Sequence, residues 1–140
     1  VREIDGVKFY NDSIASSPTR TIAGLNSFKQ KVILIAGGYD KKIPYDVMGE
    51  IIADKVKSLV LIGQTGKKID KALKDEIKRT GKGSDIPVVY SESLKDAVDA
   101  ARKYAKSGDI IILSPASASF DMFKNFAERG DMFKEIVNSI

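Results

Sequence analysis

The segment IIILSPASASFDMFKNF, residues 110–126, is the most informative part of this 140-residue chain. The four aliphatic residues 110–113 predict a strand that is buried on both faces of a parallel sheet. The loop of residues 114–119 has little side-chain bulk, so its backbone amides and hydroxyls can approach a ligand closely. The aromatic segment that begins at Phe120 predicts a helix whose free N–H groups point toward the same place. In open α/β sheets, small anions bind at such a junction.

Outward from this segment, the pattern continues with alternating strands and helices. Apolar runs at residues 32–36, 58–63 and 86–90 predict further buried strands. Residues 7–10 predict a short strand that pairs with residues 2–4 through a tight turn. The order of elements predicts a three-layer, Rossmann-like α/β fold, with a mostly parallel sheet, one antiparallel edge strand and helices on both faces. We expect residues 1–140 to form a single domain.

Prolines and polar caps indicate where the helices begin. Pro18 suits the first turn of one helix, with a serine before it as the cap. A second helix should follow Pro44 and turn Val47 inward. The final helix is expected to break or kink at Arg129–Gly130. Helical spacing favours core positions for Phe120, Phe123, Phe126 and Phe133.

The composition excludes several kinds of site. The chain contains no cysteine and no histidine, so it can form neither a thiolate site nor a Ser-His-Asp triad. Its net charge of +4 is spread over basic residues that are interleaved with acidic ones, which favours a solvated surface over a nucleic-acid interface. No apolar run approaches the ~20 residues of a membrane span. We therefore expect neither nucleic acid nor a membrane as a partner.

Three loops should leave the sheet at the same edge. They are NDSIASSP at residues 11–18, GGYDKK at residues 37–42, and SPASAS at residues 114–119. Parallel strands align their carboxyl ends, so these loops can converge and offer hydroxyls, helix N-termini, ammonium groups and a carboxylate. Such a set suits a small zwitterion or a nucleotide ribose. Each motif also has a plainer interpretation, as a helix cap, a glycine turn or a solvated lysine. The segment GQTGKK at residues 63–68 lacks the spacing of a P-loop and is interpreted as a turn and cap.

The order of these motifs resembles the C-terminal domain of the Mur ligase family. The matching segments are NDSxAS at residues 11–16, GGYDK at 37–41, and LSPASASFDxFxxFxxRGxxF at 113–133, of which the last is long and specific. The resemblance covers essentially the whole chain, but only the third of the three domains of such an enzyme. Within the family, the chain most resembles the ligases that join D-glutamate to UDP-N-acetylmuramoyl-L-alanine in cytoplasmic peptidoglycan synthesis.

The resemblance implies an ATP-dependent, amide-forming reaction. ATP phosphorylates the carboxylate of UDP-N-acetylmuramoyl-L-alanine, and the amine of D-glutamate attacks the acyl phosphate. An N-terminal domain would hold the UDP-sugar, and a central domain would hold ATP and magnesium through a P-loop. We therefore expect the 140-residue chain alone to be inactive, without a bound cofactor, a metal or a catalytic residue of its own.

The same resemblance assigns residues to substrates. Lys41 would pair with a carboxylate of D-glutamate, and Asp12 would face the ATP ribose. The family often has a lysine where this chain has Ile14, so an ammonium group is missing there or is supplied elsewhere, for example by Lys42. The D-glutamate site is implied to consist of Ser16, Lys41, Ser119, Phe120 and Phe126.

Two alternatives remain at this point. A free-standing nucleotide- or small-anion-binding Rossmann-like module, without ligase activity, would also explain the glycine loops and hydroxyl caps. A nucleic-acid binder is suggested by the net charge alone and would show steeply salt-dependent binding. We rank it last because aromatic residues do not interleave with a basic face.

Overall fold

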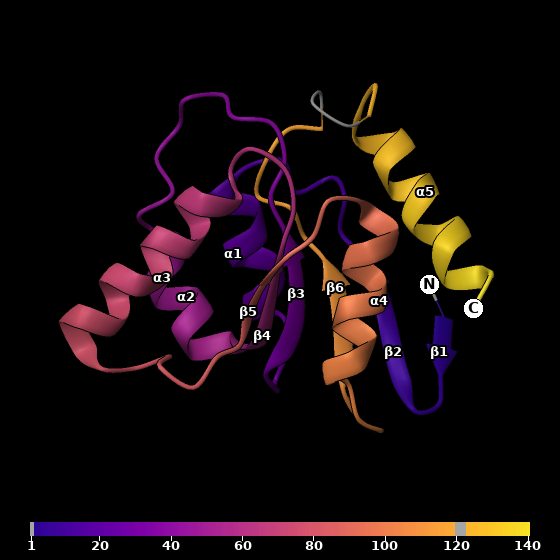
Figure 1. The fold of residues 1–140 in the computed structure, drawn as a ribbon, viewed down its shortest axis with the longest axis horizontal. Helices are drawn as coiled ribbons and strands as arrows, with labels where there is room; N and C mark the ends of the chain where they lie inside the picture. The colour runs from indigo at the N-terminus through magenta and orange to yellow at the C-terminus, as the bar shows by residue number, and fades with distance from the viewer. Residues whose placement is uncertain (1, 120–122) are drawn as a thin grey trace.

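A computed structural model describes residues 2–119 and 123–140, which form a six-stranded sheet between two layers of helices (Figure 1). The strands are β1 (Arg2–Ile4), β2 (Val7–Asn11), β3 (Val32–Ala36), β4 (Val56–Leu61), β5 (Val88–Tyr90) and β6 (Ile110–Leu113). The helices are α1 (Pro18–Asn26), α2 (Met48–Lys55), α3 (Gly66–Thr80), α4 (Leu94–Tyr104) and α5 (Phe126–Asn138). The predicted three-layer α/β fold is confirmed.

The sheet brings three strand ends together at one edge. Its strand order is β1-β2-β6-β3-β4-β5, and among these pairs only β1 and β2 run antiparallel. In the centre of the sheet, Leu113 of β6 lies opposite both Asn11 of β2 and Ile35 of β3. The loops that follow these three strands therefore begin side by side.

The unbroken apolar pattern of β3 follows from its position between two cores. All five of its residues are buried. Val32 and Leu34 pack in the core beneath α1, α2 and α3, whereas Ile33 and Ile35 pack in the core beneath α4 and α5. Figure 1 shows these two groups of helices on opposite sides of the sheet. Because each face has its own helix layer, this strand has no solvent side that would call for alternating polar residues.

Two predictions about the helices are wrong. Helix α2 begins at Met48, and the side chain of Val47 is 57% exposed instead of pointing inward. Helix α5 begins at Phe126 and continues without a break through Arg129 and Gly130. Gly130 serves close packing here, since an added Cβ would lie 3.0 Å from the side-chain nitrogen of Asn11.

The chain ends are tied to each other. The Nη1 group of Arg2 donates hydrogen bonds to the carbonyls of Val137 and Asn138, at 3.1 and 3.2 Å, so β1 is fastened to the C-terminal end of α5.

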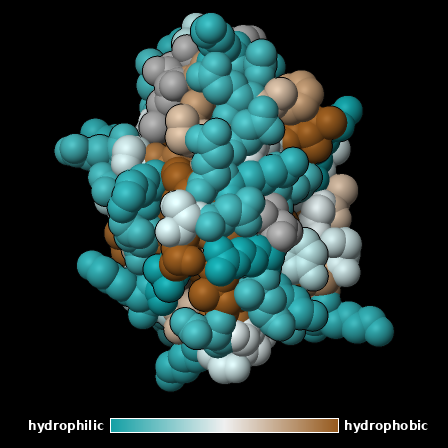
Figure 2. All heavy atoms as spheres, turned by 90° about the vertical axis from the view of Figure 1, so that its right-hand side faces the viewer, coloured by the Kyte–Doolittle hydropathy of each residue, from teal (hydrophilic) through white to brown (hydrophobic). Residues whose placement is uncertain are grey.

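Figure 2 shows that this side of the molecule is mostly hydrophilic, with apolar residues scattered over it. In the described part of the chain, no helix combines the length and the apolar character that a bilayer crossing requires.

The edge strand β5 ends in a tyrosine with a shifted pKa. The Tyr90 hydroxyl donates to Oδ2 of Asp70 at 2.7 Å, and desolvation together with this bond raises the pKa of Tyr90 to about 12. The folded state thus favours the neutral phenol. The resulting contribution to stability is present below the ordinary pKa near 10 and is lost as the pH rises through about 12.

We expect the absorbance change of Tyr90 ionisation to have its midpoint near pH 12. Replacing Asp70 by asparagine removes the carboxylate that opposes ionisation, so it should move this midpoint toward 10. A spectrophotometric titration from pH 9 to 13, with Tyr90→Phe to assign the signal, measures the shift. An unchanged midpoint in Asp70→Asn would contradict the part of the shift assigned to Asp70 and would leave desolvation as its cause.

Candidate functional site

Backbone hydrogen bonds join the three loops at the carboxyl edge of the sheet. The N–H of Ala116 donates to the carbonyl of Ala15 at 2.9 Å, which joins the loop after β6 to the loop after β2. The N–H of Tyr39 donates to the carbonyl of Ala118 at 2.8 Å, which joins it to the loop after β3. The predicted convergence of these loops is confirmed, with the segment 114–119 in the middle.

Two consecutive glycines allow this close approach. A Cβ added to Gly37 would meet the carbonyl oxygen of Ile62, and one added to Gly38 would meet the carbonyl oxygen of Ala118. Gly37 also has a φ of 113°, which disfavours other residues. The glycine pair is therefore required by packing between loops, and it is more than an ordinary turn.

Buried hydroxyl groups extend the same junction. The Thr65 hydroxyl lies 2.7 Å from the Ser117 hydroxyl, which lies 3.0 Å from the Tyr45 hydroxyl. The Thr65 oxygen also accepts a hydrogen bond from the N–H of Gly38 at 3.0 Å. Thr65 stands at the N-cap of α3, as predicted, but its side chain makes no cap bond. No sequence pattern indicated this role of Thr65 or Tyr45, since their partners are distant along the chain.

A buried arginine fixes two of the loops to α5. The side chain of Arg129 is among the largest fully buried ones, with 1% exposure. Its Nε donates to Oγ of Ser13 at 2.9 Å, and its Nη2 donates to the Ser13 carbonyl at 2.6 Å. Its Nη1 donates to the Ser117 carbonyl at 2.9 Å, and Nη2 reaches Oγ of Ser16 at 3.4 Å. The interpretation of Arg129 as part of a helix break missed this role.

The converging loops and helix ends enclose a pocket of about 420 Å³. The structure brings together four of the predicted site residues here and adds four others. The side chain of Phe126 is 46% exposed, so its predicted place in the core is wrong. Phe120 lies outside the described residues. The lining consists of Ile14, Ser16, Arg20, Lys41, Ala118, Ser119, Asn125 and Phe126.

The pocket is cationic. Arg20 and Lys41 line it, and none of the described lining residues is acidic. In the part of the chain that the structure describes, neither cation makes a hydrogen bond or an ion pair. The neighbouring carboxylate of Asp40 is held by Lys68, with 2.7 Å between Oδ2 and Nζ, and this hydrogen bond lowers the pKa of Asp40. Asp40 is therefore engaged elsewhere and leaves Lys41 available for a ligand.

Lys42, which could have replaced the missing ammonium group at position 14, does not line the pocket. Its Nζ lies 3.8 Å from Oδ2 of Asp40, and its side chain is 85% exposed. The additional cation in the lining is Arg20 from the first turn of α1. It was not predicted, because nothing in the spacing of the SSPTR segment indicates where its guanidinium group points.

Two helices begin at this pocket. Helix α1 follows Ser17, whose side chain makes no cap hydrogen bond, and α5 follows Asn125, whose side chain accepts from the N–H of Glu128 at 2.8 Å. Helix N-termini carry unsatisfied N–H groups and partial positive charge. Both ends therefore add to the positive electrostatic potential of the pocket.

Asp12 lies beside the pocket and is not among its lining residues. Its Oδ2 accepts a hydrogen bond from Oγ of Ser114 at 2.8 Å, and the residue remains partly exposed. Gly24 of α1 leaves room for this carboxylate, since a Cβ there would come within 2.7 Å of Oδ2. In the described residues, no group of three or more acidic side chains is placed to hold a metal ion.

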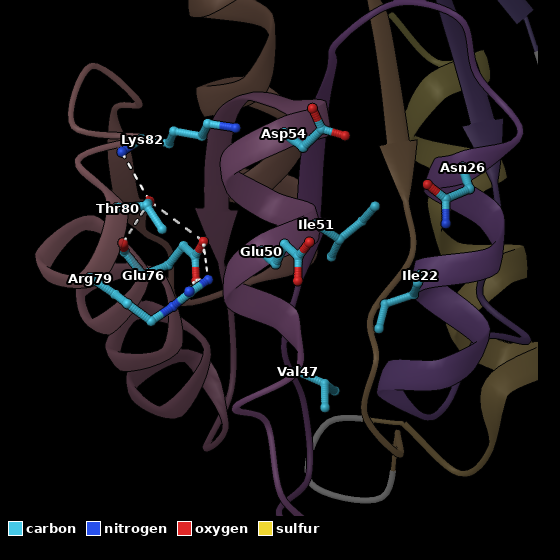
Figure 3. A pocket seen from close by; sticks show the side chains of 10 residues that line it. All are labelled: Ile22, Asn26, Val47, Glu50, Ile51, Asp54, Glu76, Arg79, Thr80 and Lys82. Atoms are coloured by element: carbon cyan, nitrogen blue, oxygen red, sulfur yellow. Dashed lines mark hydrogen bonds and ion pairs between the residues drawn. The ribbon is translucent and has the colours of Figure 1, made fainter.

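A larger pocket, of about 600 Å³, lies against α1, α2 and α3 (Figure 3). Its acids include Glu76, which forms a two-pronged ion pair with Nη2 of Arg79, with both N–O distances 2.9 Å (Figure 3). Val47 and Ile51 supply apolar parts of its wall. We place the functional site in the smaller pocket, because its described lining has cations and no acid, whereas the larger one includes Glu50, Asp54 and Glu76. The smaller pocket also has helix N-termini and loops that follow parallel strands.

The fold and the pocket together define an α/β domain with a cationic pocket at the carboxyl edge of a mostly parallel sheet. Comparison with known families gives a match over residues 1–117 to the family described as "Mur ligase, glutamate ligase domain". The chain belongs to this family, so the resemblance found in the motifs is confirmed.

Relatives with high identity carry one name. The UDP-N-acetylmuramoylalanine–D-glutamate ligase of Acetivibrio thermocellus is 75% identical over 140 residues, and that of Ruminiclostridium cellulolyticum is 57% identical over 140 residues. Each alignment covers 100% of this chain and 30% of the relative. The chain thus spans less than a third of the length of these relatives.

A solved structure supports the fold. The murein peptide ligase of Psychrobacter arcticus matches with a TM-score of 0.58 at 12% identity, over 100% of this chain and 29% of that one. At this identity the likeness concerns the arrangement of strands and helices only.

Proposed function

We propose that this chain is the D-glutamate-binding domain of an ATP-dependent ligase, which adds D-glutamate to UDP-N-acetylmuramoyl-L-alanine in cytoplasmic peptidoglycan synthesis. The observation that carries the proposal is the pocket with Arg20 and Lys41, both without partners among the described residues. The names of the relatives support the same substrate. A free-standing binding module is not favoured, because the chain belongs to a ligase family.

The pocket offers suitable groups for an amino acid with two carboxylates. The ammonium group of Lys41 pairs with one carboxylate, and the hydroxyls of Ser16 and Ser119 donate to carboxylate oxygens. The half-exposed ring of Phe126 packs against the carbon chain of the ligand. Charge-assisted hydrogen bonds of this kind contribute about 1.5–3 kcal/mol each, so a few of them hold a small zwitterion.

The same cations assist the reaction at the amine. D-glutamate must give one ammonium proton to solvent before its nitrogen can attack the acyl phosphate. Positive charges nearby disfavour the ammonium form and lower the pKa of the amine, so they increase the neutral, nucleophilic fraction. Fixing both carboxylates also orients the nitrogen, which reduces the entropy lost in reaching the transition state.

ATP would supply the phosphoryl group that activates the carboxylate of the UDP-sugar, and a central domain would hold ATP and magnesium. The chain contributes one group toward ATP. Asp12, partly exposed beside the pocket and oriented by Ser114, accepts a hydrogen bond from a ribose hydroxyl when the domains close. Magnesium would be held by the partner domains, and the described residues of this chain contain no acidic cluster suited to a metal.

The test of this function is an assay of the full-length protein that contains this chain. Phosphate release should require ATP, magnesium, UDP-N-acetylmuramoyl-L-alanine and D-glutamate together. D-glutamine, which has lost one carboxylate charge, should be a far poorer substrate. Phosphate release that does not depend on D-glutamate, or a preference for another amino acid, would overturn the proposal.

The isolated chain of residues 1–140 should show no ATP hydrolysis with magnesium, because its sequence lacks a P-loop and its described residues contain no acidic cluster that could hold a metal. Its affinity for D-glutamate should be weak, since closure of the domains completes the site. Phosphate release by purified chain, with a matched Lys41→Ala preparation to detect contaminating ATPases, measures this. Metal-dependent turnover that tracks the pure protein would contradict the prediction.

A further inference from the structure

We propose that Arg20 is the second cation of the D-glutamate site and pairs with one carboxylate of the substrate while Lys41 pairs with the other. This inference rests on the proposed function and extends it to a residue that the motifs did not indicate. It assigns to the first turn of α1 a direct part in selecting an amino acid with two negative charges.

Geometry is the first argument. Arg20 and Lys41 come from different elements, α1 and the loop after β3, yet they line one pocket together with Ser119. Both side chains are exposed, and neither has a partner among residues 2–119 and 123–140. Arg79, in contrast, forms an ion pair with Glu76 on α3.

The position of Arg20 in its helix is the second argument. It is the third residue of α1, where the helix dipole disfavours a positive charge, and no acidic residue in that first turn offsets it. Local stability therefore favours a neutral or acidic residue at this position. A residue that opposes local stability at a pocket is expected where binding requires it, and a bound carboxylate would reverse the unfavourable interaction.

The chemistry of the guanidinium group is the third argument. A planar guanidinium can donate two parallel hydrogen bonds to one carboxylate, which fixes both the position and the plane of that carboxylate. The neighbouring lining residue Ile14 is apolar and cannot do this. Lys42 does not reach the pocket, so Arg20 and Lys41 are the two cations of the described lining.

The experiment uses the full-length protein with Arg20→Gln, Arg20→Lys, Lys41→Ala and Lys42→Gln variants, and measures steady-state ligation. Arg20→Gln should raise the KM for D-glutamate by about 10- to 100-fold and leave the KM for ATP within about twofold. The KM of Arg20→Lys for D-glutamate should lie between the values of Arg20→Gln and of the unsubstituted protein, because lysine keeps the charge and lacks the planar pair of donors. Lys42→Gln removes a charge from the neighbouring loop and should change either KM by less than about twofold.

Thermal unfolding of the same proteins without ligand supplies a readout that a structural role would not give. Arg20→Gln should leave the melting temperature unchanged or slightly higher, because it removes a cation from a helix N-terminus. A rise in KM accompanied by a clear loss of thermal stability would overturn the proposal, since a structural defect would explain both effects.

The outcomes separate the two proposals. If the unsubstituted protein ligates D-glutamate and Lys41→Ala raises its KM, but Arg20→Gln does not, then the role of Arg20 is wrong and the proposed function stands. If the unsubstituted protein does not ligate D-glutamate, the proposed function fails. Equal effects of Arg20→Gln and Lys42→Gln would also overturn the role of Arg20, since general surface charge would then explain the result.

Discussion

Replacing Arg129 by methionine is expected to lower the free energy of unfolding of this domain by about 3–5 kcal/mol. The substitution keeps much of the side-chain volume and removes the donors to the Ser13 carbonyl, the Ser13 hydroxyl and the Ser117 carbonyl. These acceptors are buried, so water cannot easily replace the lost hydrogen bonds. The loops that carry the proposed site would lose their attachment to α5.

Urea denaturation and thermal unfolding of the 140-residue chain measure this effect. The melting temperature should fall by roughly 10–20 °C. Arg129→Lys should recover little, because an ammonium group cannot reproduce the planar set of donors. Arg102→Ala is the matched control, since Arg102 lies exposed on α4, and it should change stability by no more than about 0.5 kcal/mol. A loss in Arg129→Met as small as that of the control would contradict the structural role.

Replacing Lys41 by alanine is expected to raise the KM for D-glutamate of the full-length protein by about 10- to 100-fold. The reason is that Lys41 lines the cationic pocket while its neighbour Asp40 is engaged by Lys68. The KM for ATP should change by less than about threefold, because Lys41 is assigned to the amino acid alone. Initial rates at varied D-glutamate and at varied ATP give the two constants separately.

The control for Lys41 is its neighbour in the same loop. Lys42→Gln removes an equal charge at a side chain that is 85% exposed, and both KM values should stay close to those of the unsubstituted protein. Equal increases of the two KM values in Lys41→Ala would show that the loop acts on ATP as well, and the assignment to D-glutamate would then be wrong.

The strands were predictable from sequence because buried parallel strands leave continuous apolar runs, as at β3 and β6. Helix boundaries were less predictable. The Arg129–Gly130 pair has the local character of a break, yet tertiary packing keeps α5 continuous, since Gly130 lies against Asn11 and Arg129 binds two loops. Local propensity is weak beside such contacts.

The proposed site was predictable only in part, because tertiary contacts between distant residues leave no local sequence signal. Family motifs led to Ser16, Lys41, Ser119 and Phe126, which the structure brings into one pocket. They did not lead to Arg20, because the sequence of a helix does not show which site a charged side chain faces. Nor did they lead to the Thr65–Ser117–Tyr45 hydroxyls, whose partners are 52 and 72 residues apart in the chain.

The hydrogen bonds that join the three loops run largely between main-chain atoms, as from Ala116 to Ala15 and from Tyr39 to Ala118. Any amino acid other than proline supplies those same amides and carbonyls. These main-chain bonds are thus independent of the side chains at positions 14, 20 and 41, which line the pocket. Libraries varied at positions 14, 20 and 41 can therefore be screened for acceptance of other amino acids while the scaffold beneath them is retained.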